Sequence, residues 1–292
     1  MRILLPSDRS AASLQAARML ADYRGDRARI QPMLLNVQRP VLRAWPGHGL
    51  DRAAVEDALR EAGMAELRAA QEILSGAGFA PELVARLGHA PQAIVEEAQR
   101  ADVDAIVMGT RGHGPLGGFA LGSVALRVAQ SAERPVVLIK PESTLPAGLG
   151  TRVRIVLPVD GSEAATMAAA RIAGCGDALG RLQVDVVHFQ QPLTVMEAMA
   201  PPHRDALSHW SGREADEAVA GAREALRASG VEHQIHILAG DPATDIARFT
   251  RERAADLIAM STRGLGALHH AFIGSVAMNT SHLSPVPVLL MR

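Results

Sequence analysis

Short apolar runs alternate along the chain with longer segments whose apolar residues recur every three or four positions. Residues 2–6 form an apolar run that stops at Pro6-Ser7-Asp8, a pattern typical of a buried strand. Residues 51–75 instead carry their apolar side chains at helical spacing, and Gly76-Ala77-Gly78 predicts the end of that helix. The chain therefore begins as strands that alternate with helices.

The same pattern continues to the end of the chain. In the first half it predicts strands at 2–6, 30–37, 82–87, 103–108 and 135–139, and helices at 10–20, 51–75, 91–99 and 123–132. In the second half it predicts strands at 153–158, 183–189, 233–239, 257–260 and 286–291. Alternating strands and helices predict a parallel sheet with helices on both faces, and strands that are apolar throughout agree with a doubly covered sheet.

The second half repeats the first at a constant offset of 152 residues. Four separated blocks align without a gap: residues 3–8 with 155–160, 108–112 with 260–264, 122–125 with 274–277, and 135–138 with 287–290. This period exceeds the roughly 20–50 residues of a solenoid repeat and is the size of a domain. We therefore predict two α/β domains, residues 1–141 and 152–292, joined by a linker at 142–151. Each has a five-stranded parallel sheet covered by helices on both faces.

Composition narrows the class of partner. The 292 residues carry a formal net charge of −1, so nothing points to nucleic acid or to an anionic membrane. No apolar run reaches the about 18 residues that a membrane span needs. Cys175 is the only cysteine, which excludes an intrachain disulfide and favours a reducing, cytoplasmic location.

The candidate site lies where parallel strands end. In open α/β sheets, ligands bind beyond the carboxyl ends of the strands, at the point where the winding reverses. Asp8 and Asp160 follow the first strand of each half, and a glycine-rich segment, 109–123, follows the fourth strand. Glycines let the backbone approach a ligand, and the helix predicted from Ser123 turns its free N–H groups to the same space. This combination suits a phosphate chain.

At these residues the chain resembles the universal stress protein family. The resemblance rests on the spacing Gly109-x2-Gly112-x9-Gly122-Ser123, on the strand ending at residues 157–162, and on Gly240-Asp241-Pro242. It covers both halves. It implies a flavodoxin-like fold and a binding site for ATP or another adenine nucleotide, with or without Mg²⁺. It also implies that the two halves pair as an intramolecular pseudo-dimer; whether two chains associate further stays open.

The resemblance also assigns roles. Asp8 and Asp160 would lie by the nucleoside, and Val37 and Phe189 would line the adenine pocket. The remaining predicted binding residues belong to the two glycine-rich loops: Gly109, Arg111, Gly112, Gly114, Gly122, Ser123 and Val124 in the first half, and Ser261, Arg263, Gly264, Gly266, Gly274, Ser275 and Val276 in the second. Gly122 and Gly274 are expected to lie against the phosphates and to need a positive φ. No residue is assigned to catalysis or to a metal.

Each half departs from the family pattern in a different place. Arg9 replaces the glycine of Asp-Gly-Ser in the first half, and Ser261 replaces the first glycine of the loop in the second. His269 and His270 lie within the nine-residue spacer of the second half. Whether both halves bind nucleotide equally is therefore open.

Plainer interpretations compete with a binding site. The glycines can serve only to turn the chain, and Asp8 and Asp160 can act as helix caps. A P-loop is excluded, because the only lysine is Lys140, in the last strand. His233 and His236 lie three positions apart in a predicted strand and so on opposite faces, which argues against a shared metal. Cys175 has no partner base in the sequence and is expected to be an inert thiol.

The function predicted from these observations is regulation of a stress response through adenine-nucleotide binding. One alternative is a slow ATPase or nucleotide-transferring enzyme. Another is a scaffold that has lost its nucleotide sites, for which Arg9 and Ser261 are the arguments.

Overall fold

The computed structural model describes residues 1–40, 52–111, 121–190, 204–264 and 273–292; of 204–211 it describes the helical backbone alone. The chain divides into two compact units, unit 1 at Met1–Leu145 and unit 2 at Pro146–Arg292. Unit 1 contains β1 (Arg2–Pro6), α1 (Ala11–Ala21), η1 (Arg27–Arg29), β2 (Gln31–Gln38), α2 (Arg52–Gly76), β3 (Glu82–Leu87), α3 (Ala90–Arg100), β4 (Ala105–Gly109), α4 (Ser123–Ser131) and β5 (Val136–Ile139).

Unit 2 repeats this order. Its elements are β6 (Thr151–Val159), α5 (Glu163–Ala173), α6 (Gly176–Leu179), β7 (Gly180–Gln190), α8 (Arg204–Ala228), β8 (Glu232–Ala239), α9 (Pro242–Glu252), β9 (Leu257–Ser261), α10 (Ser275–Leu283) and β10 (Val288–Met291). The predicted strands and helices are therefore confirmed in kind and order, with boundaries that differ by a few residues.

Each unit is built on a five-stranded parallel sheet, as predicted. The strands of unit 1 lie in the order β3-β2-β1-β4-β5, and those of unit 2 in the order β8-β7-β6-β9-β10. All eight pairings within the units are parallel. In unit 1 the winding reverses between β1 and β4, which is where such sheets bind ligands.

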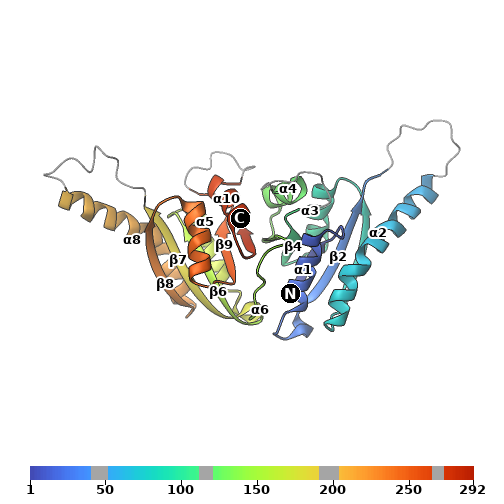
Figure 1. Ribbon diagram of the computed structural model, residues 1–292, viewed down its shortest axis with the longest axis horizontal. Coiled ribbons are helices and arrows are strands. Elements are labelled where there is room, and N and C mark those ends of the chain that lie inside the picture. Colours follow the sequence, from blue (N-terminus) through green and yellow to red (C-terminus); the bar gives the residue numbers. More distant parts are fainter. Residues whose placement is uncertain (41–51, 112–120, 191–203, 265–272) are drawn as a thin grey trace. The chain divides into compact units, whose positions relative to one another are not determined.

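Helices cover both faces of each sheet (Figure 1). In unit 1, α1 packs with α2, and α3 packs with α4; in unit 2 the corresponding pairs are α5 with α8 and α9 with α10. The central strands are therefore buried on both faces: Ile3, Leu4 and Leu5 are consecutive and at most 6% exposed. Each fully buried side chain of this kind stabilises the fold by about 1.5–3 kcal/mol.

The duplication extends to polar anchors at the amino ends of the sheets. The backbone N–H of Arg2 donates to Asp104 (2.6 Å), and that of Arg154 donates to Asp256 (2.8 Å). Both arginine side chains also donate to the carbonyl that ends the third major helix, Ala101 O in unit 1 and Arg253 O in unit 2. The same hydrogen bond therefore links the start of β1 to the start of β4 in unit 1, and β6 to the start of β9 in unit 2.

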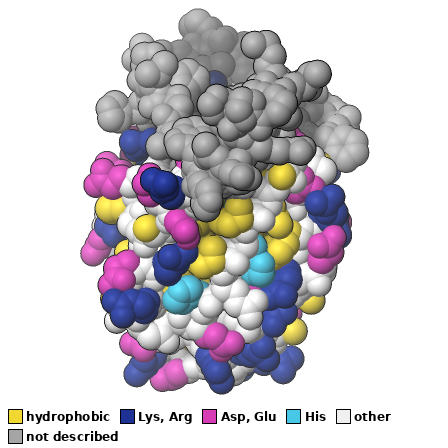
Figure 2. Space-filling model, turned by 90° about the vertical axis from the view of Figure 1, so that its left-hand side faces the viewer, with side chains coloured by type: hydrophobic (Ala, Val, Ile, Leu, Met, Phe, Trp, Pro, Cys, Tyr) yellow, Lys and Arg dark blue, Asp and Glu magenta, His cyan; other side chains and the backbone are white. Residues whose placement is uncertain are grey.

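The edge strand β8 has a mixed surface. Ile237 is 40% exposed, and His233, Ile235 and His236 are half-buried. Figure 2 shows this side of unit 2, where hydrophobic and histidine side chains lie between charged ones. No helix in the described part of the chain is long and apolar enough to cross a membrane.

Candidate functional site

A cavity of about 410 Å³ lies at the carboxyl ends of β1, β2 and β4 in unit 1. Its volume falls within the roughly 300–1,000 Å³ of small-molecule sites. Seven residues predicted from the sequence line it: Asp8, Val37, Gly109, Arg111, Gly122, Ser123 and Val124. The structure thus brings together the end of the first strand, the end of the second and the start of α4. Gly112 and Gly114, predicted for the same site, lie outside the described residues.

Asp8 and Asp160 brace the turn that precedes a helix, but neither is its N-cap. Ser10 caps α1 by accepting from Ser13 N (3.3 Å), and Ser162 caps α5 by accepting from Ala165 N (3.2 Å). The aspartates accept instead from the backbone N–H of those serines, at 3.1 Å in both units. The serines are therefore the N-caps. Each aspartate stabilises the turn before the helix by accepting a backbone hydrogen bond, and this bond also fixes the position of its carboxylate.

The residue after each aspartate has a left-handed backbone. Arg9 has φ 61° and Gly161 has φ 83°. The glycine of the family pattern therefore serves a positive φ, and Arg9 adopts that conformation at a cost of about 1–2 kcal/mol. The Arg9 guanidinium lies 3.5 Å from the Glu66 carboxylate on α2. This departure from the pattern leaves the shape of the turn intact.

Gly109 is explained by packing. A Cβ there would lie 2.7 Å from both the carbonyl carbon and the Cβ of Ala12, and 2.8 Å from Ser13 N. Helix α1 therefore crosses directly over Gly109. Its counterpart Ser261 does carry a side chain, and its hydroxyl donates to Arg263 O (2.5 Å).

The expectation of a positive φ at Gly122 and Gly274 is wrong. Both have φ −58°, a value open to any residue. Gly122 is required for a different reason: its N–H donates to Thr110 O (2.7 Å), and a Cβ would lie 2.8 Å from that same oxygen. At Gly274 the corresponding distance to Thr262 O is 3.6 Å, an ordinary contact.

Helix α4 begins at the cavity without a side-chain cap. Its N-cap is Gly122, whereas Ser10, Ser162 and Asp241 cap α1, α5 and α9 with side-chain oxygens. The N-cap of α3, His89, makes no side-chain capping bond either, and Ala90 and Ile94 of α3 line the same cavity. Two helix N-termini therefore direct N–H groups and a partial positive charge toward this space.

Thr110 is a functional candidate that sequence reasoning missed, and Thr262 is its counterpart in unit 2. They are 3% and 4% exposed, and neither hydroxyl has a hydrogen-bond partner among the described residues. A buried polar group left unpaired costs about 1–3 kcal/mol. Thr110 lines the cavity, and the only sequence signal was its repetition at the offset of 152.

The charged side chains that line the described part of the cavity are Asp8, Arg39 and Arg111. Arg39 was not predicted, because nothing in the sequence distinguishes it from other arginines. Asn36 is buried and fixed: it donates to Ser7 O (2.8 Å) and accepts from Gln38 (2.9 Å). Asp8, Asn36 and Val37 also line a neighbouring cavity of about 470 Å³. The described lining thus combines apolar side chains with an excess of one positive charge.

In unit 2 the predicted residues are less completely described. Asp160, Phe189, Ser261, Arg263, Gly264, Gly274, Ser275 and Val276 belong to the described part, and Gly266 lies outside it, as do His269 and His270. The Asp160 carboxylate accepts from the Ser162 hydroxyl (2.6 Å), and a side chain at Gly264 would overlap it. The end of β6 and the loop after β9 are therefore in contact in unit 2, at the positions equivalent to the unit 1 cavity.

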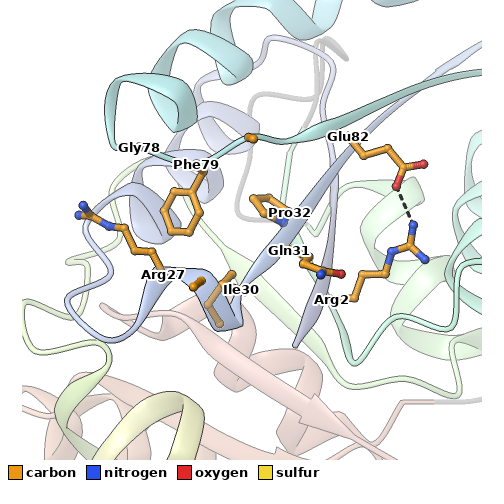
Figure 3. Close-up of a pocket in the computed structure, with 10 residues that line it drawn as sticks. Arg2, Arg27, Ile30, Gln31, Pro32, Gly78, Phe79 and Glu82 are labelled. Carbon is orange, nitrogen blue, oxygen red and sulfur yellow. Dashed lines mark hydrogen bonds and ion pairs between the residues drawn. The ribbon is translucent and has the colours of Figure 1, made fainter.

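Another cavity, of about 560 Å³, lies at the opposite end of the unit 1 sheet. Figure 3 shows Arg2 pointing to Glu82 on one side of it, an ion pair of 2.6 Å, and Arg27 beside Phe79 on the other. The Arg27 guanidinium lies 5.7 Å from the centre of the Phe79 ring. Arg2 and Arg27 thus already interact with Glu82 and Phe79, and none of the predicted site residues lines this cavity. We therefore assign the binding site to the carboxyl ends of the strands.

The two histidines expected not to share a metal, and the cysteine expected to be inert, each have a local partner. His233 Nδ1 is 2.8 Å from Val231 O, and His236 Nε2 is 2.9 Å from Asp185 Oδ1. Within the described ranges, no three His, Cys, Asp or Glu side chains gather as a metal site would require. Burial raises the pKa of the Cys175 thiol, which disfavours the reactive thiolate.

The fold and the repeat define the class: two flavodoxin-like α/β units in tandem. The profile of the universal stress protein family matches residues 1–140 and 152–292. A universal stress protein of Mycobacterium tuberculosis is 30% identical over 259 residues, which cover 86% of this chain and 79% of that protein. One of Mycolicibacterium smegmatis is 25% identical over 270 residues, covering 89% and 86%.

Solved structures agree on the fold. The crystal structure of a universal stress protein from Archaeoglobus fulgidus matches with a TM-score of 0.66 and 21% identity, covering 100% of this chain and 96% of that one. This chain belongs to the universal stress protein family, in the form that carries two family domains in tandem.

Proposed function

We propose that this universal stress protein binds an adenine nucleotide, ATP or a relative, at the carboxyl end of the unit 1 sheet. Regulation of a stress response through that binding is the activity we infer. The observation that carries the proposal is the uncapped start of α4 next to the buried, unpaired Thr110 hydroxyl. N–H groups without side-chain acceptors suit phosphate oxygens, and a ligand oxygen or hydroxyl would satisfy Thr110.

The rest of the lining fits the parts of a nucleotide. Leu35, Val37 and Ile94 form an apolar wall that suits a base, and the Asp8 carboxylate suits ribose hydroxyls. Arg39 and Arg111 supply positive charge for phosphates. Mg²⁺ would accompany the phosphates as their counterion, with Asp8 as the one carboxylate in the described lining.

An enzyme is the weaker alternative. Lys140, the only lysine, lies 3.8 Å from Glu142, and neither residue is in the described lining of the cavity. Asp8 has no second carboxylate in that lining with which to share a metal or a proton. A pure scaffold is disfavoured by the buried Thr110 hydroxyl in the cavity lining, because a site that binds nothing gains no stability from leaving that hydroxyl unpaired. Phosphate release measured over hours separates a binder from a slow ATPase.

The proposal is tested by calorimetric titration of ATP and GTP into the full chain and its Thr110→Val variant, with and without EDTA. Valine has the shape of threonine without the hydroxyl. The variant should bind ATP about tenfold more weakly, since a net hydrogen bond is worth about 0.5–1.5 kcal/mol. Its ligand-free melting temperature should not fall, because an unpaired buried hydroxyl is removed. A parent protein that binds neither nucleotide would refute the proposal.

Two further elements belong to the proposal. We also propose a cytoplasmic location, which is supported by the single cysteine, because a chain without an intrachain disulfide suits a reducing compartment. The pairing of the two halves within one chain, and any association of two chains, stay predictions.

A further inference from the structure

We propose that the two halves have diverged in ligand charge, so that unit 1 alone binds the nucleoside polyphosphate and each chain carries one. This inference rests on the proposed function and concerns the same type of site in both halves. Its determinants are the residues that differ at equivalent positions: Asp241 and Asp245 at the start of α9, and Ser261 at the end of β9.

The starts of the third major helices differ in charge. In unit 1 the N-terminus of α3 has His89 and Ala93, makes no side-chain capping bond, and turns Ala90 and Ile94 to the cavity. The equivalent residues of α9 are Asp241 and Asp245. Asp241 caps the helix by accepting from Thr244 N (2.9 Å), and hydrogen bonds from Thr244 lower the pKa of Asp241. The positive helix end that α3 presents in unit 1 is therefore neutralised at α9 in unit 2, whereas the starts of α4 and α10 both lack a side-chain cap.

Asp245 adds a second carboxylate in the same turn. It is 7% exposed and lies against Gly240, where any side chain would overlap its carboxylate. Arg248 pairs with it at 2.7 Å, but the Arg248 side chain is 62% exposed, so water screens that charge more than the buried carboxylate. A polyphosphate at the unit 2 site would approach two carboxylates that unit 1 lacks at the equivalent positions, His89 and Ala93.

The arginines differ in the same direction. Arg111 and Arg263 are equivalent, but the position of Arg39 is taken in sequence by Gln191, which lies outside the described residues. At these positions, and with Arg248 and its unit 1 equivalent Glu96 included, unit 1 has Arg39 and Arg111 against Asp8 and Glu96, and unit 2 has Arg248 and Arg263 against Asp160, Asp241 and Asp245. The set of unit 2 is therefore the more negative one.

The loop after the fourth strand is also tied differently. In unit 1 the Ser10 hydroxyl donates to Arg111 O (3.1 Å). In unit 2 the equivalent carbonyl, Arg263 O, accepts from Ser261 instead (2.5 Å), and the Ser162 hydroxyl donates to Asp160 (2.6 Å). The Asp160 carboxylate thus accepts a serine hydroxyl in addition to the serine N–H that both Asp8 and Asp160 accept.

The base-binding side is bulkier in unit 2. Phe189 replaces Val37, and His188 replaces Asn36, with His188 Nδ1 lying 3.0 Å from Val159 O. At the position expected to line the base, the phenylalanine ring occupies more volume than the valine side chain does. The charges, the loop hydrogen bonds and the side-chain volumes all favour nucleotide binding in unit 1 over unit 2.

Native mass spectrometry of the full chain with ATP, ADP and adenosine tests the inference. The parent should bind one ATP, more tightly than ADP, and adenosine weakest. Thr110→Val should weaken that binding about tenfold, and the matched Thr262→Val should leave it unchanged. Circular dichroism shows that each variant is folded, and ATP-induced amide shifts in residues 121–125 against 273–277 locate the ligand independently of either variant.

A gain of binding completes the test. The double variant Asp241→Ser, Asp245→Ala keeps a capping oxygen and removes both charges, and it should bind a second ATP. Two equal sites in the parent, or a loss with Thr262→Val and none with Thr110→Val, would overturn the division while leaving the proposed function standing. If the unmutated protein binds no adenine nucleotide, both the division between the units and the proposed function are contradicted.

Discussion

The two units have different charged clusters at the same place in the fold, between the outer strands of the sheet and the third major helix. In unit 1 the buried carboxylate is Glu97 on α3, and it pairs with Arg86 of β3 (2.6 Å) and with Arg100. In unit 2 it is Asp185 on β7, which pairs with His236 of β8 and Arg253 after α9, both at 2.9 Å. Both carboxylate side chains are 2% exposed. The carboxylate has moved from the helix to the strand, while the fold has stayed the same.

The comparison separates the packing that both units share from the residues that provide this packing in each unit. The fold requires a closed flank, a serine hydroxyl on the loop carbonyl, and close contact between the first helix and the fourth strand. Different residues meet these needs: Glu97 or Asp185, and Ser10 or Ser261. Because different residues can meet the same packing requirement, the side chains around the site can differ between the halves, and ligand preference can differ with them.

The largest expected effect is at the buried carboxylate of unit 2. Asp185→Asn leaves the half-buried Arg253 and His236 without their acceptor charge, and it should lower the free energy of unfolding by about 3 kcal/mol. Urea denaturation followed by circular dichroism measures the loss.

The matched change in unit 1 is Glu97→Gln. Its partners Arg86 and Arg100 have side chains that are 43% and 57% exposed, so water compensates them and the loss should be about 1 kcal/mol. Equal losses in the two variants would show that the clusters are equivalent.

The next effect concerns the residue that ends the fourth strand. Gly109→Ser places a side chain against the Ala12 backbone, and overpacking of this kind costs about 1–3 kcal/mol. The exchange in unit 2, Ser261→Gly, should cost less than about 1 kcal/mol, through added flexibility and one lost hydrogen bond. Thermal unfolding of both variants measures the difference. A Gly109→Ser protein as stable as the parent would mean that α1 does not pack as closely as described.

A smaller effect is expected at the left-handed residue after each aspartate. Gly161→Arg introduces a side chain at φ 83° and 3.1 Å from Ala218 Cα, so it should destabilise by about 1–2 kcal/mol. Arg9→Gly removes strain but adds backbone entropy, and these terms of about 1 kcal/mol offset each other. Chemical denaturation of the pair decides whether Arg9 is a tolerated substitution, as we expect, or a stabilising one.

The smallest effect is a pH dependence in unit 1. Burial alone raises the pKa of Glu97, but hydrogen bonds from Arg100 and Arg86 outweigh it and hold that pKa below its ordinary value. A carboxyl whose pKa is lower in the folded chain stabilises it above the unfolded-state pKa of about 4.3 and loses that effect as the pH falls through the folded-state pKa. The stability difference between the parent and Glu97→Gln should therefore be constant near neutral pH and shrink below about pH 4. A difference that grows on acidification would contradict the assignment.

Strands and helices could be predicted because their apolar periodicity is strong. The predicted strands at 2–6 and 82–87 coincide with β1 and β3, and the other boundaries shift by a few residues at helix caps and strand ends. The two units could be predicted because the second half repeats the first at one constant offset.

The site could be predicted only in outline. Glycine spacing located the loop after β4, but it gave the wrong reason for Gly122, whose φ is ordinary and whose role is to let Thr110 O approach. Thr110 and Arg39 were missed, because burial without a partner and proximity to a cavity are properties of the folded chain. The charged clusters at Glu97 and Asp185 were missed for the same reason.

Hydrogen–deuterium exchange with and without ATP tests the central claim most directly, because it reports both binding and location. We predict that ATP slows amide exchange in the peptides that cover residues 35–40 and 109–125, and leaves those covering 261–277 unchanged. No change at the first two segments, or protection at residues 27–32 and 78–82 around the cavity at the opposite end of the sheet, would contradict the account.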